Sequence, residues 1–240
     1  MFKPDDLPKS TALTGLLDFL YPPYCLVCDG EISEPGQVIC RSCWLKSSNN
    51  GAIFCVNCRK ILIDTLKCPD CSNSSQFPVF CLGHYIPPLK EIIHHFKYHG
   101  FSRLGEDLLI NLLSPYLEIL NKLEIDYTIP IPLDSYREKG RGFNQAAILS
   151  DIISRKVNSP FLAGALTKDR RTRDQTKLDI LEREKNMKGA FKADTEMLLG
   201  KRVLLVDDVI TTGATLKEAA SAILNANGAV VAALVVASAS

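Results

Sequence analysis

A stretch near the carboxyl end, from Arg202 to Leu216, constrains the fold of this chain more than any other. It begins with the unbroken apolar run Val203–Val206, which is typical of a strand buried on both faces of a parallel sheet. Two carboxylates, Asp207 and Asp208, follow directly, and a Thr-Thr-Gly-Ala-Thr loop then leads into a helical pattern. Ligands of open α/β sheets bind at the carboxyl ends of strands, where a helix start offers free N–H groups and a positive dipole end. This order of strand, acids, loop and helix predicts a site for a phosphorylated ligand.

The thirteen positions from Val203 to Thr215 resemble the phosphoribosyl-diphosphate (PRPP) motif of type I phosphoribosyltransferases: four apolar residues, two acidic, two apolar, then Thr-Thr-Gly-x-Thr. The resemblance implies that the two acids hold the ribose hydroxyls of PRPP and that the loop cradles its 5′-phosphate, with Mg²⁺ bound alongside. The alternative is a strand-turn-helix with a single capping residue, but a cap does not need this ordered set. The residues implied to contact PRPP are Asp207, Asp208, Val209, Thr211, Thr212, Gly213, Ala214 and Thr215.

Eight of the nine cysteines form four Cys-x-x-Cys pairs in the first third of the chain. Each pair places two thiolates on a tight turn, and two pairs complete one tetrahedron, so we predict two structural Zn²⁺ sites with no open position for substrate. Free buried thiols and redox pairs are the alternatives. Sequential grouping of the pairs is the simplest, and an interleaved grouping, first with third and second with fourth, stays open. The predicted ligands are Cys25, Cys28, Cys40, Cys43, Cys55, Cys58, Cys68 and Cys71.

The cysteine-rich segment has few large apolar residues, so we expect metal to supply the folding energy that a core would otherwise give. The composition changes between Ser72 and Pro78, and we therefore expect a double zinc ribbon at residues 1–75 and a phosphoribosyltransferase-like domain at 76–240. The ninth cysteine, Cys81, is expected to be buried in a strand, with His84 as an optional further ligand.

Hydrophobic patterns predict an α/β domain with a mainly parallel sheet flanked by helices, because strands and helices alternate from Tyr127 onward. Strands are expected at 79–85, 127–131, 161–166, 189–193, 203–206 and 229–237. Helices are expected at 13–20, 89–96, 104–120 with a boundary near Pro115, 144–157 and from Leu216 to about Ala226.

A basic loop follows the expected strand 127–131 and carries Arg137, Lys139 and Arg141, the last between two glycines. The resemblance places a pyrophosphate loop here, and it implies that Arg137 and Arg141 assist catalysis together with Asp207 and Asp208. The alternative is a solvated basic turn. A further segment, 168–188, holds eight Lys/Arg and five Asp/Glu with few apolar residues, and it reads as a mobile lid or as a charged linker.

Composition excludes several classes of protein. The chain is 46% hydrophobic and 23% charged with a net charge of +1, so nothing draws it globally toward nucleic acid or membranes. We expect no membrane span and no signal peptide, because the apolar patch 16–21 is short and contains Asp18. Paired cysteines without a secretion signal favour the reduced cytoplasm.

The motifs Leu-Tyr-Pro-Pro-x-Cys-x-x-Cys, Phe-Lys-Tyr-x-Gly and Arg-Gly-Phe-Asn-Gln, together with the PRPP motif, resemble the competence protein F family from about Leu16 to the carboxyl end. The resemblance implies a cytoplasmic bacterial protein linked to natural DNA uptake. It leaves two functions open. One is an enzyme that transfers ribosyl 5-phosphate from PRPP, or a related phosphorylated ribose, to an unknown nitrogen acceptor. The other is a non-catalytic adaptor that binds single-stranded DNA or a competence helicase.

Overall fold

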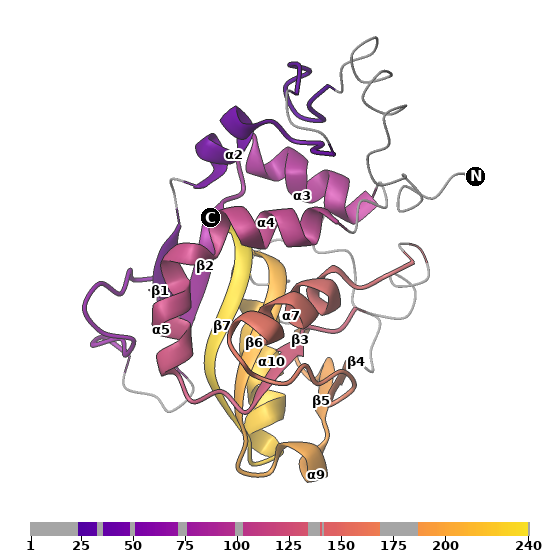
Figure 1. Cartoon of the computed structure of the whole chain (residues 1–240). Coiled ribbons are helices and arrows are strands. Elements are labelled where there is room, and N and C mark those ends of the chain that lie inside the picture. Colours follow the sequence, from indigo (N-terminus) through magenta and orange to yellow (C-terminus); the bar gives the residue numbers. More distant parts are fainter. Residues whose placement is uncertain are drawn as a thin grey trace.

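The computed structural model describes residues 24–32, 36–48, 51–71, 76–98, 103–133, 140, 142–168 and 187–239. At its centre lies a five-stranded sheet of order β1-β2-β7-β6-β3, in which β1 is antiparallel to β2 and the other neighbours are parallel (Figure 1). Two short strands, β4 and β5, form a separate antiparallel pair. The strands are β1 Ala52–Cys55, β2 Pro78–His84, β3 Tyr127–Pro130, β4 Leu166–Lys168, β5 Phe191–Ala193, β6 Arg202–Ile210 and β7 Ala229–Ser238.

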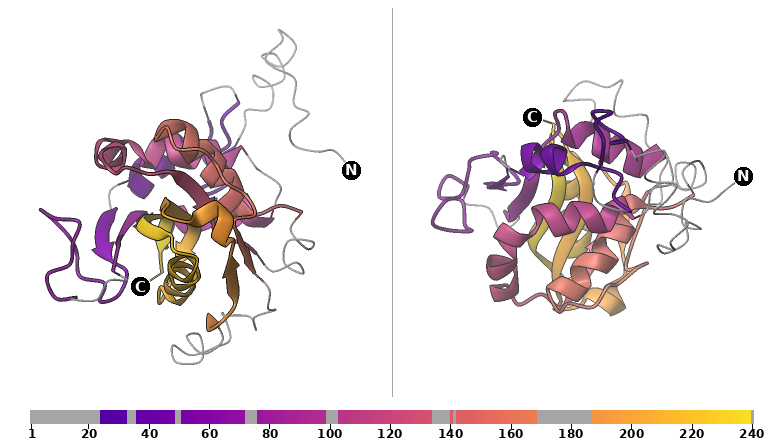
Figure 2. Two further views of the ribbon diagram at one scale, coloured as in Figure 1. Left: turned by 90° about the horizontal axis from the view of Figure 1, so that it is seen from below. Right: turned by 45° about the horizontal axis from the view of Figure 1, so that its top comes forward.

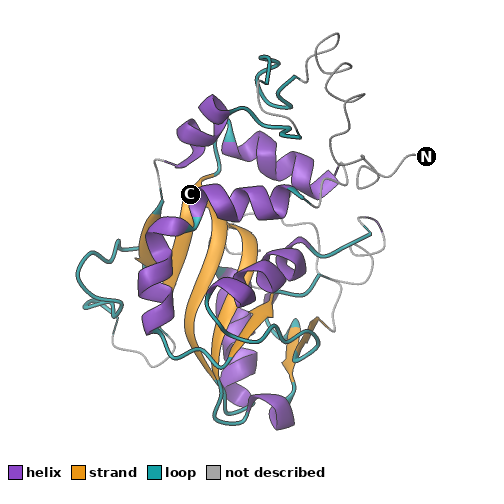
Figure 3. Cartoon of the chain, in the orientation of Figure 1, coloured by secondary structure: helices purple, strands orange, loops and turns teal. Residues whose placement is uncertain are grey.

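Helices lie on both faces of the sheet (Figures 2 and 3). α3, α4, α5 and α7 contribute buried residues to the core on one face, and α10 contributes to the core on the other. The helices are α2 Arg41–Ser47, α3 Leu89–Tyr98, α4 Leu104–Leu112, the 3-10 turn η3 Ser114–Tyr116, α5 Leu117–Lys122, α7 Gln145–Lys156, α9 Thr195–Leu198 and α10 Ala214–Asn225.

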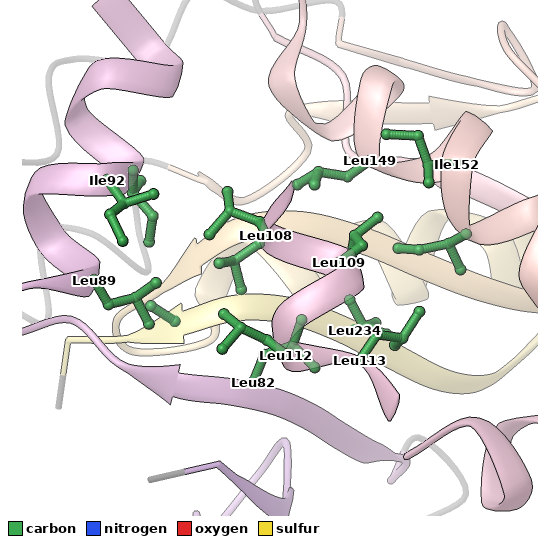
Figure 4. Close-up of a cluster of buried hydrophobic side chains, with 14 of the residues drawn as sticks. Leu82, Leu89, Ile92, Leu108, Leu109, Leu112, Leu113, Leu149, Ile152 and Leu234 are labelled. Carbon is green, nitrogen blue, oxygen red and sulfur yellow. The ribbon is translucent and has the colours of Figure 1, made fainter. Parts of the chain in front are cut away.

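The alternation of side chains along β6 and β7 divides the interior into two cores. Leu204 and Leu234 pack with the helices α3, α4 and α7, and the close-up of this cluster shows Leu234 among the leucines of α4 (Figure 4). Val203 and Leu205 pack on the opposite face with α10 and with Phe191 of β5. The apolar run of the sequence is therefore buried on both sides, as expected for a central parallel strand.

Most expected elements are confirmed, and one is wrong. The boundary expected near Pro115 is confirmed: the segment 104–120 is divided into α4, η3 and α5, because Pro115 lacks a backbone N–H and the chain tightens into a 3-10 turn around it. The expected strand 161–166 is wrong: Phe161 makes an isolated bridge to Thr128, and the true strand begins at Leu166. Gly164, at φ +85°, separates the two. The expected helix 13–20 lies outside the described residues.

The cysteine-rich segment is joined to the sheet. β1, which ends at Cys55, pairs with β2 along four residue pairs, from Ala52–Cys81 to Cys55–Pro78. Hydrogen-bonded strands therefore lie on both sides of position 75, and the division at 75/76 stays a prediction. In the described part of the chain, no helix has the length and apolar character needed to cross a membrane.

Candidate phosphoribosyl site and zinc centres

The eight paired cysteines gather into two groups, and each group combines pairs that are consecutive in the sequence. Within each group the ligand atoms lie within 4.8 Å of one another. A zinc ion bound by four sulfurs at about 2.3 Å requires sulfur–sulfur distances of about 3.8 Å. The measured Sγ–Sγ distances are 3.9 Å for Cys25–Cys43, 3.7 Å for Cys28–Cys40, 3.8 Å for Cys55–Cys71 and 3.5 Å for Cys58–Cys68.

These distances fit two tetrahedral zinc sites, so the cysteines are placed for structural zinc. The interleaved grouping is excluded, because the first and third pairs belong to different groups. Cys81 belongs to neither group; it is buried in β2, and its thiol donates to the carbonyl of Gly83 at 3.1 Å. His84 ends β2 as an exposed residue and is in neither cysteine group.

The first zinc centre is anchored to the main core. α2 begins directly after Cys40, whose backbone N–H donates to Cys25 Sγ at 3.4 Å. Ile39 and Trp44 are buried in the core that also contains α3 and α4. His95 of α3 hydrogen bonds through Nε2 to the carbonyl of Leu26 at 3.0 Å.

The second zinc centre contacts the predicted phosphate loop. The carbonyl oxygen of Val56 lies next to Gly213, 3.4 Å from where a Cβ on that glycine would sit. Arg59, between Cys58 and Lys60 on the same turn, stacks over Phe54 and donates from Nη2 to Ser238 Oγ at 2.7 Å. Ser238 pairs with Ile210, the last residue of β6.

The predicted phosphate loop has the backbone that its sequence suggests. Gly213 adopts a left-handed conformation, φ +81°, and caps α10 without a side-chain hydrogen bond to the helix. Thr212 Oγ1 accepts from the N–H of Ala214 at 3.3 Å. The first turn of a twelve-residue helix therefore faces the end of β6, which is the arrangement that binds anions at helix starts. Thr211, Thr212 and Thr215 are half-buried.

The two acids lie within β6, which continues to Ile210. Asp208 lies on the α3 side of the sheet, where its carboxylate meets the lysine at the end of that helix. Asp208 Oδ2 pairs with Lys97 Nζ at 2.9 Å, and the two side chains are only 15% and 14% exposed.

The pKa of the Asp207 carboxyl group is raised above its ordinary value. Its Oδ1 accepts from the N–H of Asp208 at 2.8 Å. Burial, and secondarily the charge of Asp208, nevertheless raise the pKa of Asp207 from 3.8 to about 7, against the opposing effects of that hydrogen bond, Lys97 and Lys168. The two acids are therefore chemically different: Asp208 has a close ammonium partner, and Asp207 is near its titration point at neutral pH.

The start of α7 contacts both the residue after β3 and Lys97, the partner of Asp208. Asn144 caps α7 by accepting from the N–H of Ala146 at 3.0 Å, and its amide donates to the carbonyl of Ile131 at 3.1 Å. Gln145 Nε2 donates to the carbonyl of Lys97 at 3.4 Å. The motifs Phe-Lys-Tyr-x-Gly and Arg-Gly-Phe-Asn-Gln, far apart in the sequence, are therefore in contact.

Lys97 is the residue that sequence reasoning missed. The motif Phe-Lys-Tyr-x-Gly, which contains this lysine, was noted in the sequence. The helical periodicity, however, predicted only which apolar residues are buried, and it gave no reason to place a lysine near the site. Of the predicted site residues, Asp207, Asp208, Val209, Thr211, Thr212, Gly213, Ala214 and Thr215 are brought together at the junction of β6 and α10. Arg137, Lys139 and Arg141 lie outside the described residues, and so does 169–186 of the expected lid.

Carboxylate oxygens are ligands that Mg²⁺ accepts, usually together with substrate phosphates and water. Asp207 and Asp208 offer such oxygens in the last part of β6, near the start of α10, so the donor set fits a cation that arrives with a phosphorylated ligand.

The fold and the site define a class: a phosphoribosyltransferase-type α/β domain that carries cysteine-ligated metal centres at its amino end. The family model "Phosphoribosyl transferase domain" matches residues 140–240, and "Double zinc ribbon domain" matches residues 16–72. Relatives that align with this chain over most of their length identify the family within this class. The chain belongs to the family of competence protein F, which includes YhgH and ComFC.

Three relatives illustrate the match. Competence protein F of Haemophilus influenzae is 30% identical over 202 residues, covering 81% of this chain and 87% of the relative. The DNA utilization protein YhgH of Escherichia coli strain K12 is 30% identical over 219 residues, covering 87% and 93%. Competence protein ComFC of Bacillus subtilis is 24% identical over 225 residues, covering 83% and 88%.

Among solved structures, an adenine phosphoribosyltransferase from Leishmania donovani aligns with a TM-score of 0.39 at 13% identity, over 67% of this chain and 71% of that chain. The family assignment depends on the sequence relatives.

Proposed function

We propose that this protein binds PRPP together with Mg²⁺ and transfers ribosyl 5-phosphate to a nitrogen acceptor, with release of pyrophosphate. The observation that carries the proposal is the junction of β6 and α10, where two acids are followed by a loop that turns at the left-handed Gly213 into a helix start. The family match to a phosphoribosyltransferase domain supports it.

Each part of the junction has a chemical task in this proposal. The N–H groups at the start of α10 and the hydroxyls of Thr211, Thr212 and Thr215 bind the 5′-phosphate. The carboxylates of Asp207 and Asp208 accept hydrogen bonds from the two ribose hydroxyls, which fixes the sugar ring. Mg²⁺, when bound, neutralises charge on the diphosphate.

The reaction breaks the bond between the sugar C1 and the diphosphate and forms one to the acceptor nitrogen. Positive charge develops on the ring as the diphosphate leaves. The protein therefore needs no nucleophile and acts by stabilising separating charges. Arg137 and Arg141 are proposed to bind the departing pyrophosphate, and the segment 168–188 is proposed to exclude water.

The names of the relatives supply the biological setting. Two are called competence proteins and others DNA utilization proteins, so we place this protein in the handling of DNA taken up by a bacterial cell, in the cytoplasm. The acceptor is accordingly sought first among nucleobases.

Calorimetry tests the proposal. The wild-type protein should bind PRPP in the presence of Mg²⁺, and the double variant Asp207→Ala, Asp208→Ala should lose that binding while remaining folded. Asp151→Asn is the matched control, because Asp151 pairs with Arg155 on the exposed side of α7. Titrations with added nucleobases, followed by pyrophosphate release, identify an acceptor. Wild-type protein that fails to bind PRPP contradicts the proposal.

The second candidate is a non-catalytic adaptor for single-stranded DNA or a helicase, favoured by the naming of YhgH as a DNA utilization protein. It predicts salt-dependent DNA binding that survives the double Asp variant. Loss of PRPP binding without loss of DNA binding would show that the two activities use different surfaces.

A further inference from the structure

Lys97 is a lysine held firmly at the edge of the site. It stands on the last turn of α3, whose other face is buried through Leu89, Ile92, Ile93 and Phe96. Gln145 fixes its carbonyl, and the rings of Phe96 and Phe143 lie 6.1 Å apart, so α3 and the start of α7 are clamped on both sides of the lysine. Its ammonium is thereby aimed at Asp208, 2.9 Å away.

The ion pair between Lys97 and Asp208 competes with the binding of PRPP to Asp208. A ribose hydroxyl that donates to Asp208 draws on the same carboxylate charge that holds the Lys97 ammonium, so PRPP weakens the pair as it binds. The ammonium of a lysine side chain that is only 14% exposed cannot be left without a counter-charge at low cost. A new anion must therefore compensate Lys97 in the complex.

The diphosphate is the group that meets this need. The 5′-phosphate is expected at the start of α10, which is reached from β6 through the Thr211–Thr215 loop. Lys97 approaches Asp208 from α3 and lies against Gln145, at the helix that directly follows the expected pyrophosphate loop.

We propose that Lys97 is a substrate-contacting residue that leaves Asp208 to bind the diphosphate of PRPP. The inference depends on the proposed function, and it assigns α3 to the substrate site. In the free protein the lysine pairs with Asp208 and orients its carboxylate. In the complex it neutralises part of the leaving group.

The test compares two ligands in calorimetry with Mg²⁺: PRPP, and ribose 5-phosphate, which lacks the diphosphate. Lys97→Met should weaken PRPP binding by about 10- to 100-fold, the range of a lost hydrogen bond to a charged group. Binding of ribose 5-phosphate should change by less than about threefold, on the order of 0.6 kcal/mol. Lys97→Arg keeps the charge and should retain most of the PRPP affinity.

Lys90→Met is the matched control, because Lys90 is an exposed lysine on the same helix. Thermal unfolding of every variant shows whether it folds, and Lys97→Gln replaces Lys97→Met if the latter does not. Equal weakening of both ligands would overturn the inference, since Lys97 would then act only by positioning Asp208. Unchanged PRPP binding would overturn it too, with the proposed function intact. Absence of PRPP binding by the wild-type protein would reject the proposed function itself.

Discussion

The backbone at Gly213 allows a sharp test of the phosphate loop. Replacement by alanine forces a residue with a Cβ into φ +81°, which costs about 1–2 kcal/mol. The new Cβ would lie 3.4 Å from the Val56 carbonyl and 3.6 Å from Ile210 Cδ1, which are ordinary contacts, so crowding adds little. The chain should therefore fold with a modest loss of stability, because domains of this size usually have 5–15 kcal/mol.

Binding of PRPP should also weaken in this variant. The strain is relieved if the loop rotates Gly213 toward negative φ, and that rotation turns the N–H groups of Ala214 and Thr215 away from the phosphate. Loss of one charge-assisted hydrogen bond, about 1.5–3 kcal/mol, predicts a 10- to 100-fold weaker affinity for PRPP in calorimetry.

Gly200→Ala is the control variant, because it introduces a similar backbone strain at a position away from the phosphate loop. Gly200 has φ +68° with open space around its Cβ position, and it lies just before the start of β6, at the opposite end of the strand from the loop. Denaturant unfolding should show comparable destabilisation of both variants, whereas PRPP affinity should fall in Gly213→Ala alone. Wild-type affinity in Gly213→Ala, or an equal loss in Gly200→Ala, would refute this reasoning.

Three further outcomes are expected. Elemental analysis should find two zinc ions per chain, and Cys58→Ser should reduce this to one because one sulfur of the second tetrahedron is lost. PRPP affinity should fall about tenfold from pH 8 to pH 6, as Asp207 takes up a proton near pH 7, and Asp207→Asn should lack this step in calorimetry. Since the folded-state pKa of this acid is above its ordinary value, its contribution to stability changes in the opposite sense and rises as pH falls from 7 toward 4. Asn144→Ala should lower the free energy of unfolding by about 1 kcal/mol through loss of the α7 cap, measured by denaturant titration; an unchanged midpoint would contradict the capping role.

The features that the sequence alone could predict are those set by residues close together along the chain. The apolar run before Asp207 is confirmed as a strand, because four consecutive apolar residues suit a sheet position that is covered on both faces. The cysteine spacing predicted two four-sulfur sites, whereas the grouping of the pairs came from the structure. The strand expected at 161–166 was wrong because Gly164 at positive φ interrupts it, and a run of apolar residues carries no information on backbone handedness.

The candidate site was predictable only in part, since it combines local and long-range features. The loop from Thr211 to Thr215 is a continuous stretch, and its residues can be read together. Lys97 and Gln145 reach the site from other helices, and their contact depends on how α3 and α7 pack on the sheet. A helical pattern identifies the buried face of α3, but it does not say what lies opposite its last turn.

The pairing of β1 with β2 has a practical consequence for anyone who shortens this protein. A fragment that starts near residue 76 would bare one whole flank of β2, a strand with six of its seven residues buried. The unpaired N–H and C=O groups of β2 could then form hydrogen bonds with a strand of another molecule. We therefore expect such fragments to self-associate. The cysteine-rich segment thus covers an edge of the sheet that would otherwise be exposed. We expect fragments that begin between this segment and β2 to be insoluble.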